Sequence, residues 1–332
     1  MRIAAVAHDP GGANAVIAVV LALRRAGVTV DLHTKGPATR RARELGAEAQ
    51  PVGADHRAIA AALDADLLVA GTSATDTFEV DATGAFAARG LPTVAVLDYP
   101  ANFAARFRRG EPAAPTWPDV ITALDAGSAA AMAADGIPAR LIRVTGQPYL
   151  AALLRRRVGR RCAAGSGRRI LFASQPGTEE VQALEWVATQ VRALGPDALL
   201  TVRFHPRQTD RAPSLRCLEQ AGVAATIDDE TPTLRVLEDH DVVLGVTSTI
   251  LVEAALLGRR AASVLVPGVP DALACLRQVL GPPLRSPAAL AEFLRAPAMR
   301  PLNTPFLAAQ WDADLRVAAL CLTLAIVARE AA

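Results

Sequence analysis

The chain has 332 residues, of which 52% are hydrophobic and 4% aromatic, and its net charge is +2. This length is long for one hydrophobic core, so we expect two domains of ordinary size. Charges of both signs are dispersed, which argues against a nucleic acid as a partner. Of the 35 basic residues only Lys35 is a lysine, and with so much Ala, Gly and Pro this indicates a GC-rich genome rather than arginine selected for a ligand.

Cysteine spacing and hydropathy narrow the class of protein further. The four cysteines lie far apart without a CxxC pair, which is typical of reduced thiols in a cytosol and gives no sign of a metal site. The opening apolar run is too short for a signal peptide. The most apolar stretch, residues 315–328, falls short of the roughly 20 residues that a membrane helix needs. We therefore expect a cytoplasmic protein without a transmembrane segment, ending in a buried or docking helix.

The first half alternates short apolar runs with helical patterns. Strands are expected at residues 3–7, 29–33, 67–70, 93–97, 120–124 and 141–144, and helices at 15–26 and 37–45. Strands that alternate with helices indicate βαβ units and a parallel sheet. The turn at residues 8–14, between the first strand and the first helix, is rich in glycine and polar side chains.

The pattern lapses between residues 155 and 169, where small and basic residues predict a linker. A nucleic-acid patch is the alternative, but the run is short and has no interleaved aromatics. A second α/β alternation follows, with strands at 170–173, 199–204, 225–227, 242–246 and 262–266. Helices are expected at 179–194, from 213, at 232–238 and at 250–257. The sequence thus predicts an N-terminal Rossmann-like domain, residues 1–155, and a C-terminal nucleotide-binding domain, residues 168–332, that includes the terminal helices.

Polar residues follow two strands of the second half. His205 and Pro206 end one strand, and Thr247, Ser248 and Thr249 end another. Ligands of open α/β sheets bind outside the carboxyl ends of the strands, so these residues are expected to face one crevice. The hydroxyls can cap the next helix, whose free N–H groups would bind an anion. A strand exit and an ordinary helix cap remain the alternative interpretation.

Further residues of the second half are candidates for nucleotide or donor binding. Glu253, one helical turn beyond the cap, is placed to reach a ribose hydroxyl, and Arg203 flanks His205 and can add positive charge. Gln175, Gly177 and Thr178 close the first strand of this half and form a second candidate phosphate cradle. A plain tight turn explains this last group equally well.

Two Rossmann-like halves, a linker and a terminal helix resemble the GT-B fold, in which two such domains face a central crevice and the C-terminal helix packs back. His205-Pro206 with Ser248 resembles the nucleotide-binding motifs of bacterial sialyltransferases and capsule-polymer transferases. Residues 9–12, with Gly11 and Gly12, and residues 245–253 are similar to UDP-N-acetylglucosamine 2-epimerases and hydrolases. The sequence lacks the acidic-acidic-Gly motif of the sialyltransferases, and it does not reproduce the signature loops of the epimerases.

This resemblance implies an inverting glycosyltransferase that needs neither metal nor cofactor and takes a pyrimidine nucleotide-sugar and a small-molecule or glycan acceptor. The first alternative is an epimerase or hydrolase that acts on the nucleotide-sugar without an acceptor. The second alternative is a sugar-nucleotide-binding protein without catalysis.

A general base is expected from the first half, because the second half holds the nucleotide. His8 and Asp9 leave the first strand at the expected crevice, and histidine is the usual group for proton transfer near neutral pH. Asp98, at the end of another strand of the same sheet, competes for this role. Asp9 has an alternative role in shaping the turn.

An acceptor site is expected beside these groups. Tyr99 offers an aromatic face for a sugar ring, Asn102 lies in the same loop, and Arg106 offers a partner for a carboxylate or phosphate. Asn14 is a further candidate for the acceptor side, although capping the turn into the first helix is its alternative role. Packing beneath the loop is the alternative for the aromatic residues.

Overall fold

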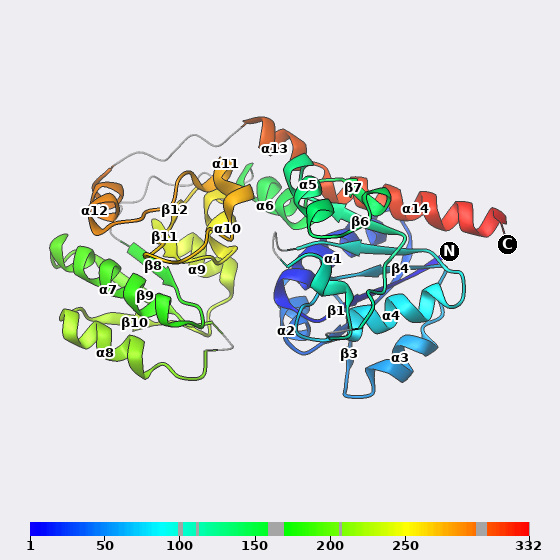
Figure 1. Cartoon of the computed structure of the whole chain (residues 1–332), viewed down its shortest axis with the longest axis horizontal. Helices are drawn as coiled ribbons and strands as arrows, with labels where there is room; N and C mark the ends of the chain where they lie inside the picture. The colour runs from blue at the N-terminus through cyan, green and yellow to red at the C-terminus, as the bar shows by residue number, and fades with distance from the viewer. Residues whose placement is uncertain (99–101, 111–112, 159–168, 206–207, 297–303, 332) are drawn as a thin grey trace. The chain divides into compact units, whose positions relative to one another are not determined.

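The structure is a computed structural model that describes residues 1–98, 102–110, 113–158, 169–205, 208–296 and 304–331. The chain divides into two units (Figure 1). Unit 1 contains Met1–Ala152 and Ala308–Ala332, and unit 2 contains Leu153–Leu307. Each unit has its own parallel sheet with helices packed on it, so the predicted α/β class is confirmed. Most of the predicted linker, residues 159–168, lies outside the described residues.

Unit 1 contains a seven-stranded parallel sheet in the order β3-β2-β1-β4-β5-β6-β7. The strands are β1 (Arg2–Ala7), β2 (Thr29–Lys35), β3 (Gln50–Val52), β4 (Leu67–Ala70), β5 (Thr93–Val96), β6 (Val120–Ala123) and β7 (Ile142–Val144). The helices are α1 (Pro10–Arg25), α2 (Pro37–Glu44), α3 (His56–Ala62), α4 (Phe78–Ala87), η1 (Ala104–Phe107), α5 (Ala126–Ala134), η2 (Ala139–Leu141), α6 (Pro148–Val158), α13 (Thr304–Gln310) and α14 (Ala313–Ala331). Helices α6 and α13 each span a boundary between the two units.

Unit 2 contains a five-stranded parallel sheet in the order β10-β9-β8-β11-β12. Its strands are β8 (Arg169–Ala173), β9 (Leu199–Arg203), β10 (Ala225–Ile227), β11 (Val242–Gly245) and β12 (Arg260–Ser263). Its helices are α7 (Thr178–Ala193), α8 (Ala212–Ala221), α9 (Thr233–Asp239), α10 (Ile250–Leu256), η3 (Ala274–Leu276), α11 (Arg277–Leu280) and α12 (Pro287–Arg295).

Strand β1 reads as a continuous apolar run because both faces of the sheet in unit 1 are covered. Ile3 and Ala5 join a core with residues of α1 and α14, whereas Ala4 and Val6 join a second core with Phe78 and other residues of α3 and α4. Neighbouring side chains of a strand point to opposite faces, so β1 contributes to both cores.

The C-terminal helix belongs to unit 1, which corrects the expectation that residues 168–332 form one domain. The cause is the apolar face of α14: Val317, Ala318, Cys321 and Ala325 are buried in the core around α1. Burial raises the pKa of the Cys321 thiol to about 12. Among the described residues, no helix has the length and apolar composition needed to cross a membrane.

Helix α1 begins at Pro10, earlier than expected, so Gly11 and Gly12 lie in its first turn and not in a loop. Proline suits the first position of a helix, because its fixed φ is already helical and its missing N–H would have no partner there. The turn between β1 and α1 is therefore only two residues long, His8 and Asp9.

Each sheet has one point at which the direction of strand order reverses. In unit 1 the chain runs from β1 outward to β2 and β3 and then returns to β4 on the other side of β1. In unit 2 it runs from β8 to β9 and β10 and returns to β11 beside β8. The carboxyl ends at such a switch point diverge and leave room for a ligand. A functional site is therefore expected at the carboxyl ends of β1 and β4 in unit 1, and at those of β8 and β11 in unit 2.

Replacing Val317 with Asp should destabilise unit 1, because a carboxylate would enter the α1–α14 core without a partner. An uncompensated buried charge costs on the order of 3–5 kcal/mol. Leu315→Asp is the matched control, since Leu315 lies on the same helix and is 52% exposed. Calorimetric melting should show a clear drop for the first variant and little change for the second. Equal melting curves for the two variants would contradict this packing of α14.

Candidate functional site

The turn after β1 holds a histidine–carboxylate pair at the switch point of unit 1. His8 Nδ1 lies 3.0 Å from Asp9 Oδ1. Ser73, which follows β4, donates its hydroxyl to Asp9 Oδ2 over 2.9 Å, and Thr75 donates to Asp9 Oδ1 over 3.1 Å. The structure thus brings the predicted residues His8 and Asp9 together with the polar end of the neighbouring strand.

The surroundings of this pair favour its charged form. Burial lowers the pKa of His8, but the hydrogen bond with Asp9 and the charges of Asp76, Asp9 and Glu79 outweigh burial and raise it overall. Burial opposes ionisation of Asp9, but hydrogen bonds from His8, Ser73 and Thr75 outweigh it and lower the pKa of Asp9. Both shifts favour the charged forms of the pair, imidazolium and carboxylate, over the neutral forms. The raised pKa makes His8 a stronger base than an isolated histidine, and the lowered pKa makes Asp9 a weaker one.

A buried carboxyl group, Glu79 of α4, lies behind the pair. Its Oε1 accepts a hydrogen bond of 2.8 Å from the backbone N–H of His8. Its Oε2 is buried and has no hydrogen-bond partner among the described residues. Burial raises the pKa of Glu79 to about 8, so this carboxyl group is mostly protonated at neutral pH. Gly71 permits this close approach, because a Cβ there would lie 3.2 Å from Glu79 Oε1.

Asp98 follows β5, and hydrogen bonds hold its carboxyl group near the ends of β1 and β4. Its Oδ1 accepts hydrogen bonds from the Thr72 hydroxyl (3.0 Å) and from Arg106 Nη1 (2.9 Å). Its Oδ2 lies over the first turn of α1, where a Cβ on Gly11 would come within 2.2 Å of it. Burial raises the pKa of Asp98, although the charge of Arg106 opposes this. A carboxyl group in this state can change protonation closer to neutral pH than an exposed aspartate.

The candidate acceptor residues have other surroundings than expected. Arg106 is buried and binds Asp98 and the backbone carbonyl of Thr72, so its charge is used inside the protein. Asn14 is also buried and accepts a hydrogen bond from Arg41, which in turn donates to the Tyr149 hydroxyl. Arg106 and Asn14 therefore stabilise the fold beside the site.

The remaining acceptor candidates belong to the loop after β5. Asn102 is exposed, with a φ of 54° that is uncommon for a residue other than glycine. Tyr99 lies outside the described residues, so its role remains a prediction from the sequence.

In unit 2, the ends of β8 and β11 are joined through neutral groups. Gln175 Oε1 accepts hydrogen bonds of 3.0 Å from both the backbone N–H and the hydroxyl of Thr247. The Ser248 hydroxyl accepts a long bond of 3.4 Å from Ile250 N, whereas Thr249 precedes α10 without a side-chain capping bond. The structure brings Gln175 and Thr247 together at the switch point, as expected for one site.

The turn into α7 is shaped by glycine and by a buried glutamate. Gly177 has a φ of 138°, which disfavours any residue with a side chain, and α7 begins at the next residue, Thr178. Glu180 is fully buried and bonded to the hydroxyls of Ser174 (2.7 Å) and Ser214 (2.9 Å). Burial raises the pKa of Glu180, although these hydrogen bonds oppose it. Two acidic residues in the first turn of α7 disfavour an anion there, so the tight-turn interpretation of Gly177 and Thr178 fits better.

The other candidates of unit 2 lie at or near the same edge of the sheet. Arg203 donates to the carbonyls of Asp228 and Thr231, so its guanidinium fixes the loop after β10. The backbone carbonyl of His205 accepts from Gln208 N over 2.8 Å, and β8 separates the strand before His205 from β11. Glu253 is only 8% exposed, which leaves little surface for a ribose. Pro206 lies outside the described residues.

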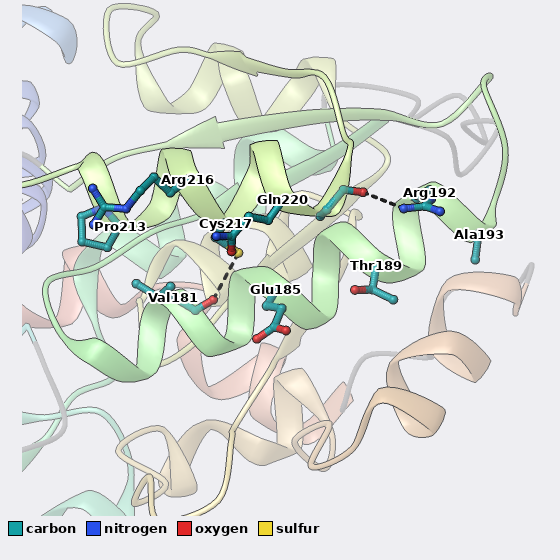
Figure 2. A pocket seen from close by; sticks show the side chains of 10 residues that line it. Val181, Glu185, Thr189, Arg192, Ala193, Pro213, Arg216, Cys217 and Gln220 are labelled. Atoms are coloured by element: carbon teal, nitrogen blue, oxygen red, sulfur yellow. Dashed lines mark hydrogen bonds between the residues drawn. The ribbon is translucent and has the colours of Figure 1, made fainter.

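A groove of about 780 Å³ lies between α7 and α8 (Figure 2). Its lining includes Glu185, Arg192 and Cys217, and the Cys217 thiol donates to the carbonyl of Val181 over 3.7 Å. None of the residues that the sequence singled out lines this groove, so we assign it no part in the site.

Sequence reasoning missed several ionisable or polar residues of the unit 1 site, namely Lys35, Ser73, Asp76 and Glu79. The polar residues after β4 gave a signal for Ser73, because they end an apolar strand as His8 does. Glu79 gave none, since Asp76 and Asp81 beside it are also acidic and nothing in the sequence sets it apart. Among the described residues, no group of three or more His, Cys, Asp or Glu side chains is arranged to hold a metal ion.

No protein-family model and no curated protein sequence matches this chain. Solved structures do match it along nearly its whole length. The UDP-GlcNAc 2-epimerase of Neisseria meningitidis bound to UDP-GlcNAc superposes with a TM-score of 0.68 at 12% identity, covering 97% of this chain and 100% of that one. The UDP-GlcNAc 2-epimerase of Methanocaldococcus jannaschii gives 0.68 at 11% identity, covering 96% and 99%. HepE of Anabaena in complex with UDP-glucose gives 0.57 at 14% identity, covering 100% and 99%.

These matches show that the chain has the GT-B-like fold of the UDP-GlcNAc 2-epimerases, as the resemblance of residues 9–12 and 245–253 implied. The interpretation of the chain as a glycosyltransferase is wrong, because several solved structures that match the chain along nearly its whole length are UDP-GlcNAc 2-epimerases. The His205-Pro206 and Ser248 motifs resemble those of the sialyltransferases, but a strand exit and an ordinary helix cap account for such residues as well.

Glu79→Gln should change how the stability of unit 1 depends on pH. The folded state raises the pKa of Glu79 to about 8, whereas the ordinary pKa of a glutamate side chain is 4.5. This contribution to stability is fully present below about pH 4.5 and is lost as the pH rises through about 8. Each unit of pKa difference corresponds to about 1.4 kcal/mol, so the total reaches several kcal/mol.

Glutamine keeps the oxygen that accepts from His8 and cannot ionise, so the variant should lose this pH dependence. Melting temperatures between pH 5 and 9 should show the wild type falling relative to the variant. Glu48→Gln, an exposed carboxyl group in the same unit, is the control and should follow the wild type. Parallel curves for all three proteins would show that Glu79 is not protonated in the folded state.

Proposed function

We propose that this protein is an enzyme that acts on a nucleotide-sugar itself, as an epimerase or hydrolase, and needs no acceptor. The observation that carries the proposal is the acid–base cluster of His8, Asp9, Glu79 and Asp98 at the switch point of unit 1, in a chain with the fold of the UDP-GlcNAc 2-epimerases. Several structures of similar fold contain UDP-GlcNAc or UDP-glucose, which supports a uridine diphosphate sugar as the substrate class.

The chemistry needs proton transfer at a sugar. Inversion of the configuration at a sugar carbon requires a base to remove a proton from that carbon and an acid to return one. His8 is suited to exchange a proton, because its hydrogen bond with Asp9 and the nearby carboxylates favour its protonated form. Asp98 is suited to exchange a proton, because burial raises its pKa. Asp9 orients His8 through the bonds that it accepts from Ser73 and Thr75.

Unit 2 supplies the other half of the proposal, the binding of the nucleotide. The Thr247 and Ser248 hydroxyls and the Gln175 side chain gather at its switch point, where an open α/β sheet binds its ligand. Neutral hydroxyl and amide groups hydrogen-bond ribose and phosphate without a metal. We accordingly propose that binding and turnover require neither a metal nor a cofactor.

Incubation with UDP-GlcNAc or UDP-glucose in D2O, without an acceptor, tests this proposal. Proton NMR should show a new sugar nucleotide with deuterium at the inverted carbon, or free sugar and UDP. Loss of a general acid or base commonly lowers the rate about 10²–10⁴-fold, so His8→Gln should lower kcat by this factor while the Kd for UDP stays the same. Turnover only after an acceptor is added, or none with either substrate, would refute the proposed reaction.

Ser248→Ala tests the nucleotide site separately. Losing a hydrogen bond to a charged phosphate should weaken UDP binding by about 1.5–3 kcal/mol in calorimetric titration. Ser286→Ala is the control, because Ser286 caps α12 in the same unit by accepting from Ala289 N. An unchanged Kd in the Ser248 variant would leave that residue with only its capping role.

A further inference from the structure

Lys35, the last residue of β2, occupies an unusual position for the only lysine among 35 basic residues. Its Nζ lies 2.6 Å from Asp76 Oδ2 and 3.1 Å from His56 Nδ1, and the side chain is 18% exposed. All the remaining basic residues of this chain are arginines. A half-buried lysine with two polar partners therefore points to a specific requirement for an ammonium group.

The partner of Lys35 is shared with the catalytic candidate His8. Asp76 Oδ2, the oxygen that Lys35 binds, also lies 3.7 Å from His8 Nε2. The other oxygen of Asp76 accepts from Phe78 N over 2.9 Å, which anchors the carboxylate at the start of α4. His8 thus has Asp9 at one ring nitrogen and Asp76 at the other, and Asp76 is divided between His8 and Lys35.

An arginine in place of Lys35 would not bind Asp76 and His56 in the same way. A guanidinium is a planar fork that favours both oxygens of a carboxylate, whereas an ammonium is a compact charge with three donors that binds one oxygen and turns a second donor elsewhere. Asp76 Oδ1 is already bound to Phe78 N, and the second donor of Lys35 faces His56.

We propose that Lys35 is a positioning residue: by binding the Asp76 oxygen that faces His8, it divides the charge of that carboxylate between two cations. The inference rests on the proposed function only in that His8 exchanges a proton there. Among the described residues, four groups face His8: Asp9 after β1, Ser73 after β4, Asp76 before α4 and Glu79 on α4. Without the ammonium, the full charge of Asp76 would act on His8, so His8 should hold its proton to a higher pH.

The test is the pKa of His8 itself, measured by NMR titration of the protein labelled in its five histidines, with His8→Gln to assign the signal. Lys35→Met should raise the pKa of His8 by about one pH unit, because a charge within about 4–6 Å has an effect of this size. Lys35→Arg, which keeps the charge, should raise it by less than half as much. His240, in the other unit, is an internal control and should not move. An unmoved His8 in Lys35→Met, or equal shifts in the two variants, overturns the inference.

The single lysine also allows a test on the wild-type chain, which protects the inference against a variant that fails to fold. Acetylation would modify only Lys35 and the N-terminal amine and would remove the ammonium charge, whereas reductive methylation modifies the same groups and keeps it. Acetylated protein should show the raised pKa of His8, and methylated protein should not. Equal titrations overturn the inference. Because no readout uses turnover, a failed substrate assay and a failed role for Lys35 remain distinguishable.

Discussion

The hydrogen bond from the His8 backbone N–H to Glu79 Oε1 is the constraint on which the site of unit 1 depends. Up to Val6 the ladder between β1 and β4 continues, and the Val6 carbonyl accepts from Gly71 N. Beyond that point the strands diverge and His8 N–H needs another partner, because a buried amide without one is costly. Glu79 provides it from α4, and this fixes the turn in which His8 and Asp9 meet Ser73.

This arrangement explains why small residues gather at the switch point. A side chain at Gly71 would press on Glu79 and on the backbone of Gly12, and one at Gly11 would press on Asp98. The start of α1, the end of β4 and two carboxyl groups are packed together there without intervening side chains. Burial of those carboxyl groups is what raises their pKa values, so the close packing and the acid–base character have one origin.

The sequence predicted the fold through its periodicity. Apolar runs of strand length alternating with helices indicated two parallel sheets, and the polar residues that end those runs marked both switch points. It did not predict Glu79 or Lys35, because their roles come from partners 71 and 41 residues away in the chain, His8 and Asp76. Lys35 stood out as the only lysine, but the arginine-rich composition was explained by a GC-rich genome. No role was therefore assigned to Lys35. The terminal helix was expected to pack back, and α14 does so in the core of unit 1.

The discontinuity of unit 1 sets an order for its synthesis on the ribosome. The face of α1 that packs on Val317, Cys321 and Ala325 is made before unit 2, and its covering helix emerges only after all of unit 2. At about 5–20 residues per second, the intervening residues 153–307 take roughly eight to thirty seconds to translate. During that time the apolar side chains of α1 remain without α14. A nascent chain of this protein therefore exposes the apolar face of α1 while unit 2 is already complete enough to fold. A chaperone bound to that face would be released only when α14 packs against it.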